Sequence, residues 1–486
     1  MVKKYEIIVI GSGFGGIGLG MNFKKAGIEN YVILERESEM GGTWWRNNYP
    51  GAAVDVQSHL YSFKSEPYSW SRLFALQPEI LDYTNYLIDK YDLRKKAHCN
   101  KNVVKTEFDE ENCEWSVFIE DGSIYKAPVL INSSGSLSQP AIPPIKGKED
   151  FKGRSFHTSR WDHSFNYENK KVAVIGTGAS SVQVVPAIAS IVKDLHVFQR
   201  SPHWVLPRPD KVLSELEQKF IHILPIITNF YRELMYWKLE SRMLAFKGNK
   251  MLIKLFQKKA EYFLKKNVPD LVLRKKLTPD FMLGCKRVLL TNDYFSTLLR
   301  DNVNLITEGI DKVNQTGLLT KNGKQIDVDL IIYATGFYAS ENNIPYPVIG
   351  RNKLSIQESW QNGAHAYLGT VVPSFPNFFI LVGPNTGIGH TSALHIMESQ
   401  IEYIMKAINS MRKNNWKTIE IKEDVEFAYN EKIQKQLSKT VWQTGGCKSW
   451  YQNKSGRNTT LYPNYSFVFR KAASKFIKND HLVMSS

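Results

Sequence analysis

The amino-acid sequence predicts an α/β fold built from two units in which a strand, a tight turn and a helix follow one another. Tyr5 to Ile10 form a short apolar run that leads into the glycine-rich turn Gly11 to Gly16, and Lys171 to Ile175 lead in the same way into Gly176 to Ser181. Such a turn between a buried strand and a helix is typical of dinucleotide-binding units. The length of 486 residues fits two or three domains. We therefore expect two Rossmann-like dinucleotide-binding domains.

The composition, with 43% hydrophobic and 23% charged residues, is that of a folded globular protein. The N-terminal apolar run is too short for a signal peptide, and no apolar run is long enough to cross a bilayer, so we expect a cytoplasmic protein. The four cysteines are far apart and show no C-x-x-C spacing, which argues against a metal site and against a disulfide framework. They are Cys99, Cys113, Cys285 and Cys447.

Lysine and arginine exceed aspartate and glutamate by 16. A surplus of this kind attracts nucleic acid, an anionic membrane surface or phosphate-bearing cofactors, and it also occurs in basic proteins that have none of these partners. A nucleic-acid partner is suggested by charge alone, and we do not expect one.

In the first unit each glycine has its own task. Gly11 allows the tight turn, Gly13 lets the backbone approach a pyrophosphate, and Gly16 lets the helix pack closely on the sheet. A second strand, Tyr31 to Leu34, ends at Glu35, at the spacing where a carboxylate accepts hydrogen bonds from a ribose. These residues predict a bound dinucleotide, with a structural glycine turn as the alternative.

The second unit repeats the turn with Gly176 and Gly178, and Ser181 replaces the third glycine. After the next strand, Arg200 and Ser201 follow the position that is acidic in the first unit. A carboxylate there would repel a 2′-phosphate, whereas an arginine can pair with it through charge-assisted hydrogen bonds. The second nucleotide should be NADPH rather than NADH, unless the arginine is only a solvated surface charge.

The stretch FKGRSFHTSRWD, Phe151 to Asp162, reproduces the pattern F-x-G-x-x-x-H-x-x-x-W-[P/D] just before the second unit. This pattern is the signature of the Baeyer–Villiger type of class B flavoprotein monooxygenases, and the chain resembles that family from Tyr5 to about Phe469. By the resemblance, this stretch would couple the position of a cofactor to domain movement. Outside the resemblance, one histidine and one tryptophan in a basic loop are more often ordinary structure. The matching residues are Phe151, Gly153, His157, Trp161 and Asp162.

The resemblance implies an FAD-binding domain that is split by an inserted NADPH-binding domain. We expect residues 1–140 and 331–486 to form the two parts of the FAD domain, and residues 141–330 to form the NADPH domain. A helical insert is expected at about residues 211–276, because apolar residues recur there three or four apart among lysines and glutamates. We interpret such residues, for example Phe230, Leu234, Trp237 and Leu239, as core packing, with weak contact to an anionic membrane surface as the alternative.

Several residues of the first half match the family's FAD site. Gly41 to Trp45 and Tyr49 to Ala52 resemble the GGTW and YPG segments, which run beside the flavin. Asp55 matches an acid that pairs with an active-site arginine, and Tyr61 matches an aromatic residue at the flavin ring. Trp45 and Tyr61 fit hydrophobic filling of the interior nearly as well. The predicted FAD-binding residues are Gly11, Gly13, Gly16, Glu35, Gly42, Thr43, Trp44, Trp45, Asp55, Tyr61, Val104 and Asn385.

Lys286 and Arg287 match a K-R pair of the family. The resemblance makes the lysine a second ligand of the 2′-phosphate and the arginine a cation over the flavin, where a guanidinium that is always charged would stabilise a negatively charged oxygen adduct. As isolated residues they would be surface charges. We predict Arg287 and Asp55 as the catalytic pair, and no metal site. The predicted NADP-binding residues are Gly176, Gly178, Ser181, Arg200, Ser201, Lys286, Arg287 and Thr335.

The resemblance implies an FAD- and NADPH-dependent monooxygenase. NADPH would reduce FAD, O2 would form a C4a-peroxyflavin, and one oxygen atom would be inserted into a small or medium hydrophobic ketone, giving an ester or lactone. Two alternatives stay open: an N- or S-oxygenating or hydroxylating flavin monooxygenase, and a redox-sensing flavoprotein without oxygenation. A flavin disulfide reductase would need a redox cysteine pair near Gly42, and the sequence has none there.

Overall fold

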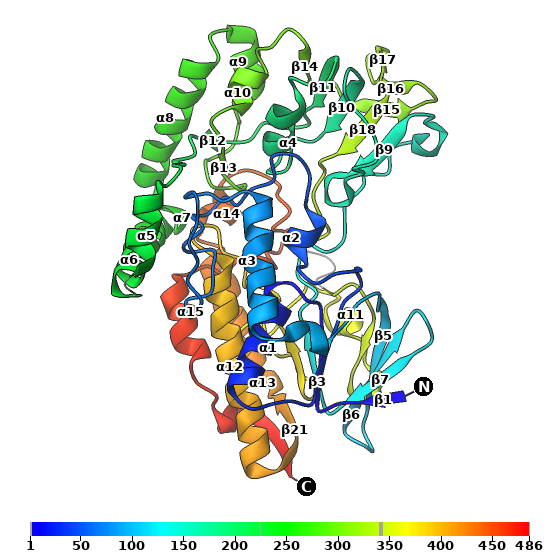
Figure 1. The fold of residues 1–486 in the computed structure, drawn as a ribbon, viewed down its shortest axis with the longest axis vertical. Coiled ribbons are helices and arrows are strands. Elements are labelled where there is room, and N and C mark those ends of the chain that lie inside the picture. The colour runs from blue at the N-terminus through cyan, green and yellow to red at the C-terminus, as the bar shows by residue number, and fades with distance from the viewer. Residues whose placement is uncertain (1, 224, 340–343, 486) are drawn as a thin grey trace.

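Two five-stranded parallel sheets lie at the centres of the two halves of the molecule, the first in the lower and the second in the upper half of Figure 1. The computed structural model describes residues 2–223, 225–339 and 344–485. None of the helices in these ranges is both long and apolar enough to span a bilayer. The predicted α/β class with two Rossmann-like units is confirmed, because each sheet has helices against its faces and a glycine turn after its central strand.

The first sheet is completed by a strand from the C-terminal third of the chain, so the first half of the molecule is assembled from both ends of the sequence. Its long strands are apolar along their whole length, as is usual where both faces of a parallel sheet are covered. Every neighbouring pair is parallel, in the order β20 (Phe378–Ile380), β8 (Val129–Asn132), β2 (Ile7–Ile10), β3 (Tyr31–Leu34) and β4 (Ala97–His98).

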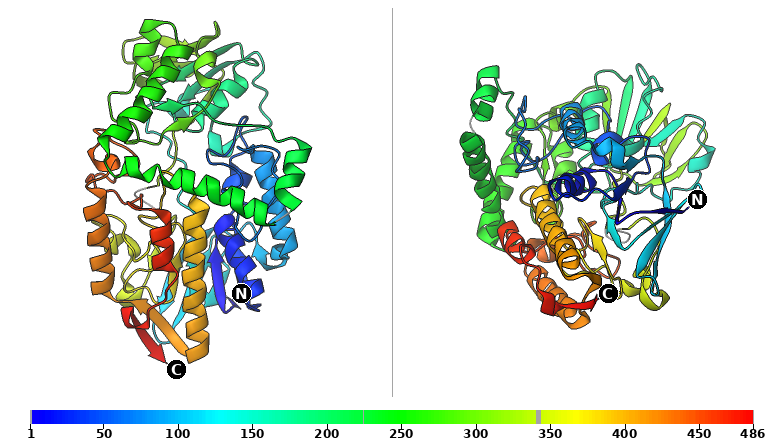
Figure 2. Two further views of the ribbon diagram at one scale, coloured as in Figure 1. Left: turned by 90° about the vertical axis from the view of Figure 1, so that its left-hand side faces the viewer. Right: turned by 60° about the horizontal axis from the view of Figure 1, so that its bottom comes forward.

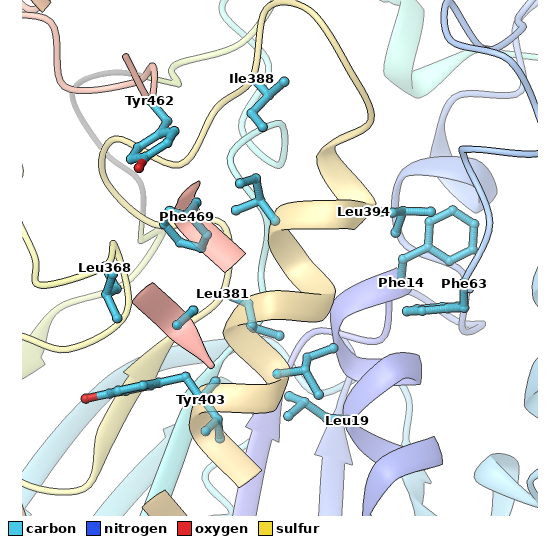
Figure 3. Close-up of a cluster of buried hydrophobic side chains, with 14 of the residues drawn as sticks. Phe14, Leu19, Phe63, Leu368, Leu381, Ile388, Leu394, Tyr403, Tyr462 and Phe469 are labelled. Atoms are coloured by element: carbon cyan, nitrogen blue, oxygen red, sulfur yellow. The ribbon is translucent and has the colours of Figure 1, made fainter. Parts of the chain in front are cut away.

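Helices α1 (Phe14–Lys25) and α12 (Ala393–Asn414) pack against each other beside this sheet. Figure 3 shows Phe14 of α1 beside Phe63 and Leu394, and the rings of Phe14 and Phe63 are 5.8 Å apart at an interplanar angle of 84°. The Ser392 hydroxyl accepts a hydrogen bond from the Leu394 N–H at 3.3 Å and so caps α12. This packing fixes the N-terminal end of α12 over the first glycine turn.

A third, mixed sheet flanks the first. Its middle strands alternate buried and partly exposed residues, since only one face meets the interior. Val2–Lys4 form its separate edge strand, and Tyr5 N donates to Lys126 O at 2.9 Å, so β2 of the first sheet begins only at Ile7. The order is β1 (Val2–Lys4), β7 (Ile124–Ala127), β6 (Glu114–Ile119), β5 (Val103–Asp109) and β19 (Val348–Ile349).

The second parallel sheet occupies the other half of the molecule. Its flanking elements include helices α4 (Ser181–Ile188) and α10 (Tyr294–Thr297) and a small antiparallel sheet of β15 (Ile310–Val313), β16 (Gly317–Thr320) and β17 (Gln325–Asp327). The strand order is β14 (Val303–Ile306), β11 (Asp194–Phe198), β10 (Lys171–Ile175), β18 (Leu330–Tyr333) and β9 (Arg154–His157).

The remaining elements are short or lie towards the C-terminus. β12 (Val205–Leu206) pairs with β13 (Leu289–Leu290), and β21 (Trp416–Ile421) pairs with β22 (His481–Ser485). The other helices outside the insert are α2 (Thr43–Arg46), α3 (Gln77–Lys90), α11 (Ile356–Ser359), α13 (Glu423–Leu437), α14 (Val441–Thr444) and α15 (Ser466–Ala473).

The helical insert runs along the left side of Figure 1, next to both halves of the molecule. Its predicted helices are confirmed, but the interpretation of Phe230, Leu234 and Trp237 as core residues is wrong, because these side chains are 71%, 60% and 55% exposed. Their helix has a second apolar stripe that faces inward and forms the core contacts. The insert comprises α5 (Glu215–Ile223), α6 (Pro225–Glu240), α7 (Met243–Phe246), α8 (Lys250–Asn267) and α9 (Leu271–Leu277).

Candidate active site

Two positions of the first glycine turn, Gly11 and Gly16, have room for nothing larger than glycine. Gly11 has φ +103°, and a Cβ there would lie 2.4 Å from the carbonyl oxygen of Ser133 at the end of β8. A Cβ on Gly16 would lie 2.1 Å from the Gly11 carbonyl oxygen, so α1 packs directly on the turn. The backbone can therefore approach a phosphate at the N-terminus of α1, where the helix dipole favours negative charge.

Glu35 lies beside this turn at the end of β3. Its Oε2 accepts hydrogen bonds from Ser12 N at 2.9 Å and Ser12 Oγ at 2.6 Å, which fixes the buried carboxylate against the glycine turn. Oε1 accepts a hydrogen bond from Glu37 N at 2.9 Å and can still accept a further one. This donor and acceptor set fits the ribose and pyrophosphate of a dinucleotide.

The loop that carries Gly42 to Trp45 lies on the glycine turn. A Cβ on Gly42 would come within 2.6 Å of Gly13 Cα, so the two backbones touch. Trp44 is buried, and its Nε1 donates to the hydroxyl of Tyr61 at 3.3 Å. Thr43 is exposed, and Trp45 is half-buried. The structure thus brings Gly13, Gly42, Trp44 and Tyr61 together in one cluster.

Arg287 and Asp55 come from segments 232 residues apart and form an ion pair. Nε of Arg287 donates to Oδ2 of Asp55 at 2.8 Å, and Nη2 lies 2.6 Å from the same oxygen. The carboxylate raises the pKa of Arg287, so the guanidinium stays charged. The two side chains remain 39% and 34% exposed, which leaves the cation open to a ligand.

Two tyrosines flank this pair. Tyr61 and Tyr451 are each within electrostatic reach of both Arg287 and Asp55, and burial raises the pKa of each phenol to about 12. Tyr451 lies in the segment between α14 and α15 and was not among the predicted site residues. Its position could not be inferred from spacing, because it approaches Arg287 only after the chain has returned from the second half to the first.

A disulfide joins Cys285 to Cys447, and the prediction that the cysteines form no disulfide is wrong. Spacing rules detect cysteines that are close in sequence, whereas these two are 162 residues apart. Cys285 lies two residues before Arg287, and Cys447 lies four residues before Tyr451. The bond therefore ties the chain around the arginine to the C-terminal segment that covers it. Cys99 and Cys113 are free.

The second glycine turn repeats the geometry of the first. Gly176 has φ +116°, and a Cβ there would lie 2.4 Å from the carbonyl oxygen of Ala334 at the end of β18. A Cβ added to Gly178 would have no atom within 4 Å, so the outer side of the turn is open. Ser181 is fully buried, and Thr335 Oγ1 donates to Ala141 O at 2.6 Å. The two glycines leave room for a ligand, whereas Thr335 ties the end of β18 to Ala141.

Two cations and a hydroxyl converge near the end of β11. Lys286 Nζ donates to Ser201 Oγ at 2.9 Å. Burial lowers the pKa of Lys286, and the charge of Arg200 lowers it further, so the two cations lie close enough to repel each other. An anion between them would relieve this repulsion. The site fits a 2′-phosphate.

The signature stretch, Phe151 to Asp162, contacts the turn that follows β18. His157 is buried, its Nε2 donates to Gly336 O at 3.0 Å, and its Nδ1 accepts from Ser159 N at 3.1 Å. Burial lowers the pKa of His157 to about 4, so the ring is neutral. Trp161 packs on Phe156 with ring centroids 5.0 Å apart. Histidine and tryptophan thus lie inside the second half and do not line the Arg287 site.

The other three residues of the signature shape its ends. A Cβ on Gly153 would lie 2.5 Å from both Asp329 O and the ring of Phe151, so glycine is needed for this close approach. Asp162 Oδ2 accepts a hydrogen bond from Arg154 Nε at 2.7 Å. These contacts hold the stretch against the edge of the second sheet.

Two of the predicted FAD-binding residues lie apart from this cluster. Val104 is 43% exposed on β5 of the third sheet. Asn385 is buried, and its Nδ2 donates to Asn458 O at 2.9 Å and to Leu461 O at 3.0 Å, so it holds the C-terminal segment in place. Among the described residues, no three His, Cys, Asp or Glu side chains are grouped as metal ligands.

Comparison with known proteins places the chain among flavoproteins. Residues 8–224 match the family model described as pyridine nucleotide-disulphide oxidoreductase. A Baeyer–Villiger monooxygenase of Pseudomonas aeruginosa is 41% identical over 97% of this chain and 90% of its own length, and one of Streptomyces coelicolor is 36% identical over 96% and 90%. The crystal structure of OTEMO in complex with FAD and NADP superposes with a TM-score of 0.89 at 29% identity and covers 99% of both chains.

Proposed function

Since this chain belongs to the Baeyer–Villiger monooxygenase family, we propose that it uses FAD and NADPH to insert one oxygen atom of O2 into a ketone, giving an ester or lactone. The ion pair of Arg287 and Asp55 at the meeting point of the two halves supports this reaction most directly. We propose that the substrate is a small or medium hydrophobic molecule and that the compartment is the cytoplasm.

The first glycine turn, Glu35 and the loop of Gly42 to Trp45 would hold FAD. Bound FAD, once reduced by NADPH, would supply the oxygen chemistry. The guanidinium of Arg287 would stabilise negative charge that develops on the reacting oxygen, because a fixed cation in a site with little water costs no reorganisation during the reaction. Asp55 would orient that guanidinium and keep it charged. Arginine cannot act as the proton donor at any working pH.

The second turn would hold NADPH. Gly176 and Gly178 would let the backbone approach its pyrophosphate, and Arg200, Ser201 and Lys286 would bind its 2′-phosphate. Lys286 and Arg287 are adjacent in the chain, so a ligand that fixes the lysine also limits the movement of the arginine. We propose that the nucleotide thereby helps to position the active-site cation.

Tyr61 and Tyr451 would exclude water from the Arg287 site, since both are large and their phenols stay neutral up to about pH 12. His157 would act as a positioning residue, because it joins β9 to the turn after β18 and does not reach the site. We also propose a division into residues 1–140, 141–330 and 331–486. It is supported by the second sheet, whose strands lie between Arg154 and Tyr333.

The proposal is tested with the purified chain loaded with FAD. NADPH consumption, peroxide release and product would be measured under ¹⁸O2 with a set of cyclic and linear ketones and a set of sulfides. We expect ester or lactone that carries one ¹⁸O atom, formed in near-equal amount to the NADPH consumed, and a strong preference for NADPH over NADH. Sulfoxide without any ester would favour heteroatom oxygenation, and peroxide alone would favour the redox-sensing alternative.

A further inference from the structure

The helical insert presents an apolar stripe to solvent. On α6, Ile226, Phe230, Leu234 and Trp237 recur at intervals of four, four and three residues and therefore share one side of the helix. Their exposed fractions run from 55% to 75%. A group of large exposed apolar side chains marks a surface that binds a protein, a ligand or a membrane. We call these four residues the outer stripe of α6.

The outer stripe cannot turn inward, because the opposite side of α6 is fixed. Arg232 Nη2 donates to Ser62 O at 2.9 Å, and Tyr236 OH bonds to Ser466 Oγ at 2.9 Å. Glu240 is buried and accepts from Ser466 N at 3.2 Å. Arg232, Tyr236 and Glu240 are four residues apart, so polar contacts hold the inner side of the C-terminal half of α6 at each turn. Rotation of the helix would break all of them.

Neighbouring helices extend the apolar surface. Leu216 and Phe220 of α5 are 79% and 64% exposed, and they are four residues apart. Met251 and Leu255 repeat this spacing on α8, where both are mostly exposed. Figure 2, left, looks at this side of the molecule and shows the green helices of the insert lying across its front, over the gold helix α12. The helices that carry these exposed apolar residues thus lie on one outer side of the protein.

Positive charge surrounds this surface. Residues 211–276 contain 15 lysines and arginines but only six aspartates and glutamates, in a chain with a total surplus of 16 positive charges. Lys219, Lys238, Lys254 and Lys258 lie beside the apolar side chains and are exposed. None of these four lysines forms an ion pair within the described part of the chain. More than half of the net charge is therefore carried by the helical insert.

We propose that this side of the helical insert docks onto the surface of an anionic lipid bilayer. The apolar side chains of α5, α6 and α8 would enter the boundary between headgroups and acyl chains, and the surrounding lysines would meet the lipid phosphates. A second copy of the chain would bring a surface of the same charge against the first, so the charge opposes self-association there. Aromatic residues such as Trp237 and Phe230 suit the interfacial zone of a bilayer.

A cavity at the end of the outer stripe supports the same orientation. It has a volume of about 180 Å³, and its lining includes the buried Arg232 and Glu233, which pairs with Lys64 at 3.1 Å. Trp237 and Phe467 also line it, together with the exposed cations Lys64 and Arg470. The rings of Trp237 and Phe467 are 5.7 Å apart, so the apolar surface continues onto α15 at the rim of the cavity. With the stripe in the bilayer, these cations would lie at the depth of the headgroups.

The proposal is tested by vesicle flotation with the FAD-loaded full chain. One vesicle preparation contains phosphatidylcholine alone, and the other contains phosphatidylcholine with phosphatidylglycerol. We expect binding to the anionic vesicles that weakens as salt is raised, and much weaker binding to the neutral ones. The double change Phe230→Ser with Leu234→Ser should lower the bound fraction about tenfold, since two apolar side chains leave the bilayer.

Matched control variants distinguish vesicle binding through this surface from nonspecific adsorption of the protein. Leu482→Ser removes a leucine that is 55% exposed on β22, and Lys312→Glu reverses a lysine on β15, while Lys238→Glu reverses a lysine beside the stripe. We expect Lys238→Glu to weaken binding and both controls to leave it unchanged. Equal loss in the controls would overturn the proposal.

Three further results would also overturn it. The first is equal binding to both kinds of vesicle, and the second is an absence of vesicle binding by a chain that holds FAD and oxidises NADPH. The third is a dimer in sedimentation velocity that dissociates in the Phe230→Ser, Leu234→Ser variant, which would make the surface an interface between copies. NADPH oxidation is measured in each sample, so a failure of membrane docking is distinguished from a failure of the oxygenation reaction.

Discussion

Arg287 directs both Nε and Nη2 at a single carboxylate oxygen of Asp55, at 2.8 and 2.6 Å. The other guanidinium nitrogen and the open side of the group are left for a ligand. A two-point contact of this kind fixes the plane of the guanidinium as well as its position, which a lysine in the same place could not do. The cation is thus oriented before any ligand arrives.

Arg287→Ala should separate NADPH oxidation from oxygen insertion. We expect reduction of FAD by NADPH to continue, while product per NADPH falls about 100-fold or more, because one fixed charge that stabilises a transition state is worth roughly that factor. The ratio of ester to peroxide checks this. Arg300→Ala, at an exposed position, is the control and should keep the native ratio. Full product yield in Arg287→Ala would contradict the assignment.

Lys286→Ala and Arg200→Ala should each weaken NADPH binding and leave NADH binding nearly unchanged. Each side chain would contribute charge-assisted hydrogen bonds to the 2′-phosphate, so KM for NADPH should rise about 10-fold to 100-fold. Steady-state kinetics with both nucleotides measures the difference, and NADH serves as the control within each variant. A parallel rise for NADH would show that the change disturbs the fold rather than the phosphate site.

Gly11→Ala should abolish FAD binding and destabilise the fold strongly, because the new Cβ would lie 2.4 Å from the Ser133 carbonyl. Gly122 offers a matched control: it has φ +81°, but no atom lies within 4 Å of an added Cβ. Gly122→Ala should therefore cost only the backbone strain, about 1 kcal/mol. Flavin content and the free energy of unfolding separate the two effects. Equal losses in both variants would show that backbone conformation, rather than the close approach, requires Gly11.

His157→Gln should reduce the pH dependence of stability. The pKa of His157 is about 4 in the folded chain against an ordinary value of 6.5, so between these values the unfolded chain binds a proton that the folded chain does not. The free energy of unfolding should therefore fall as the pH drops from about 6.5 to about 4. The variant should lose part of this slope, whereas His163→Gln, at an exposed position, should keep it. Denaturant unfolding at several pH values measures both slopes.

Cys447→Ser should loosen the C-terminal segment over the active site. We expect a stability loss of about 2–4 kcal/mol, since a long loop is no longer closed in the unfolded chain, and a larger share of peroxide because water reaches the Arg287 site. A reductant should act in the same way on the native chain and have no effect on the variant. Cys113→Ser removes a free buried cysteine and controls for substitution of cysteine as such. Unchanged coupling in Cys447→Ser would contradict the role of the bond.

Local sequence patterns predicted most of the fold. The strands before Gly11 and Gly176 and the helices after them were predicted, although the first strand begins at Ile7 rather than Tyr5, because each depends on residues that are close in sequence. The contact of Arg287 with Asp55 came only from family resemblance. A contact between residues that are 232 positions apart cannot be predicted from the periodicity or spacing of residues in the sequence.

The errors have the same origin. A disulfide between Cys285 and Cys447 is invisible to rules that compare neighbouring cysteines. For Phe230, Leu234 and Trp237, helical periodicity correctly predicted an apolar side, but α6 has two such sides, and only the tertiary structure selects the one that is buried. The spacing of apolar residues predicts that one side of a helix will be covered. It does not identify what covers that side.

The bond between Cys285 and Cys447 also gives the protein a distinct mechanical response. When the chain is pulled by its two ends, force bypasses the residues between the cysteines, whose sequence separation is 162, because they form a closed covalent ring. At about 3.5 Å per extended residue, the oxidised chain should reach a contour length roughly 570 Å shorter than the reduced chain. Strand β20 lies inside that ring, so the load could stretch this strand only after reduction.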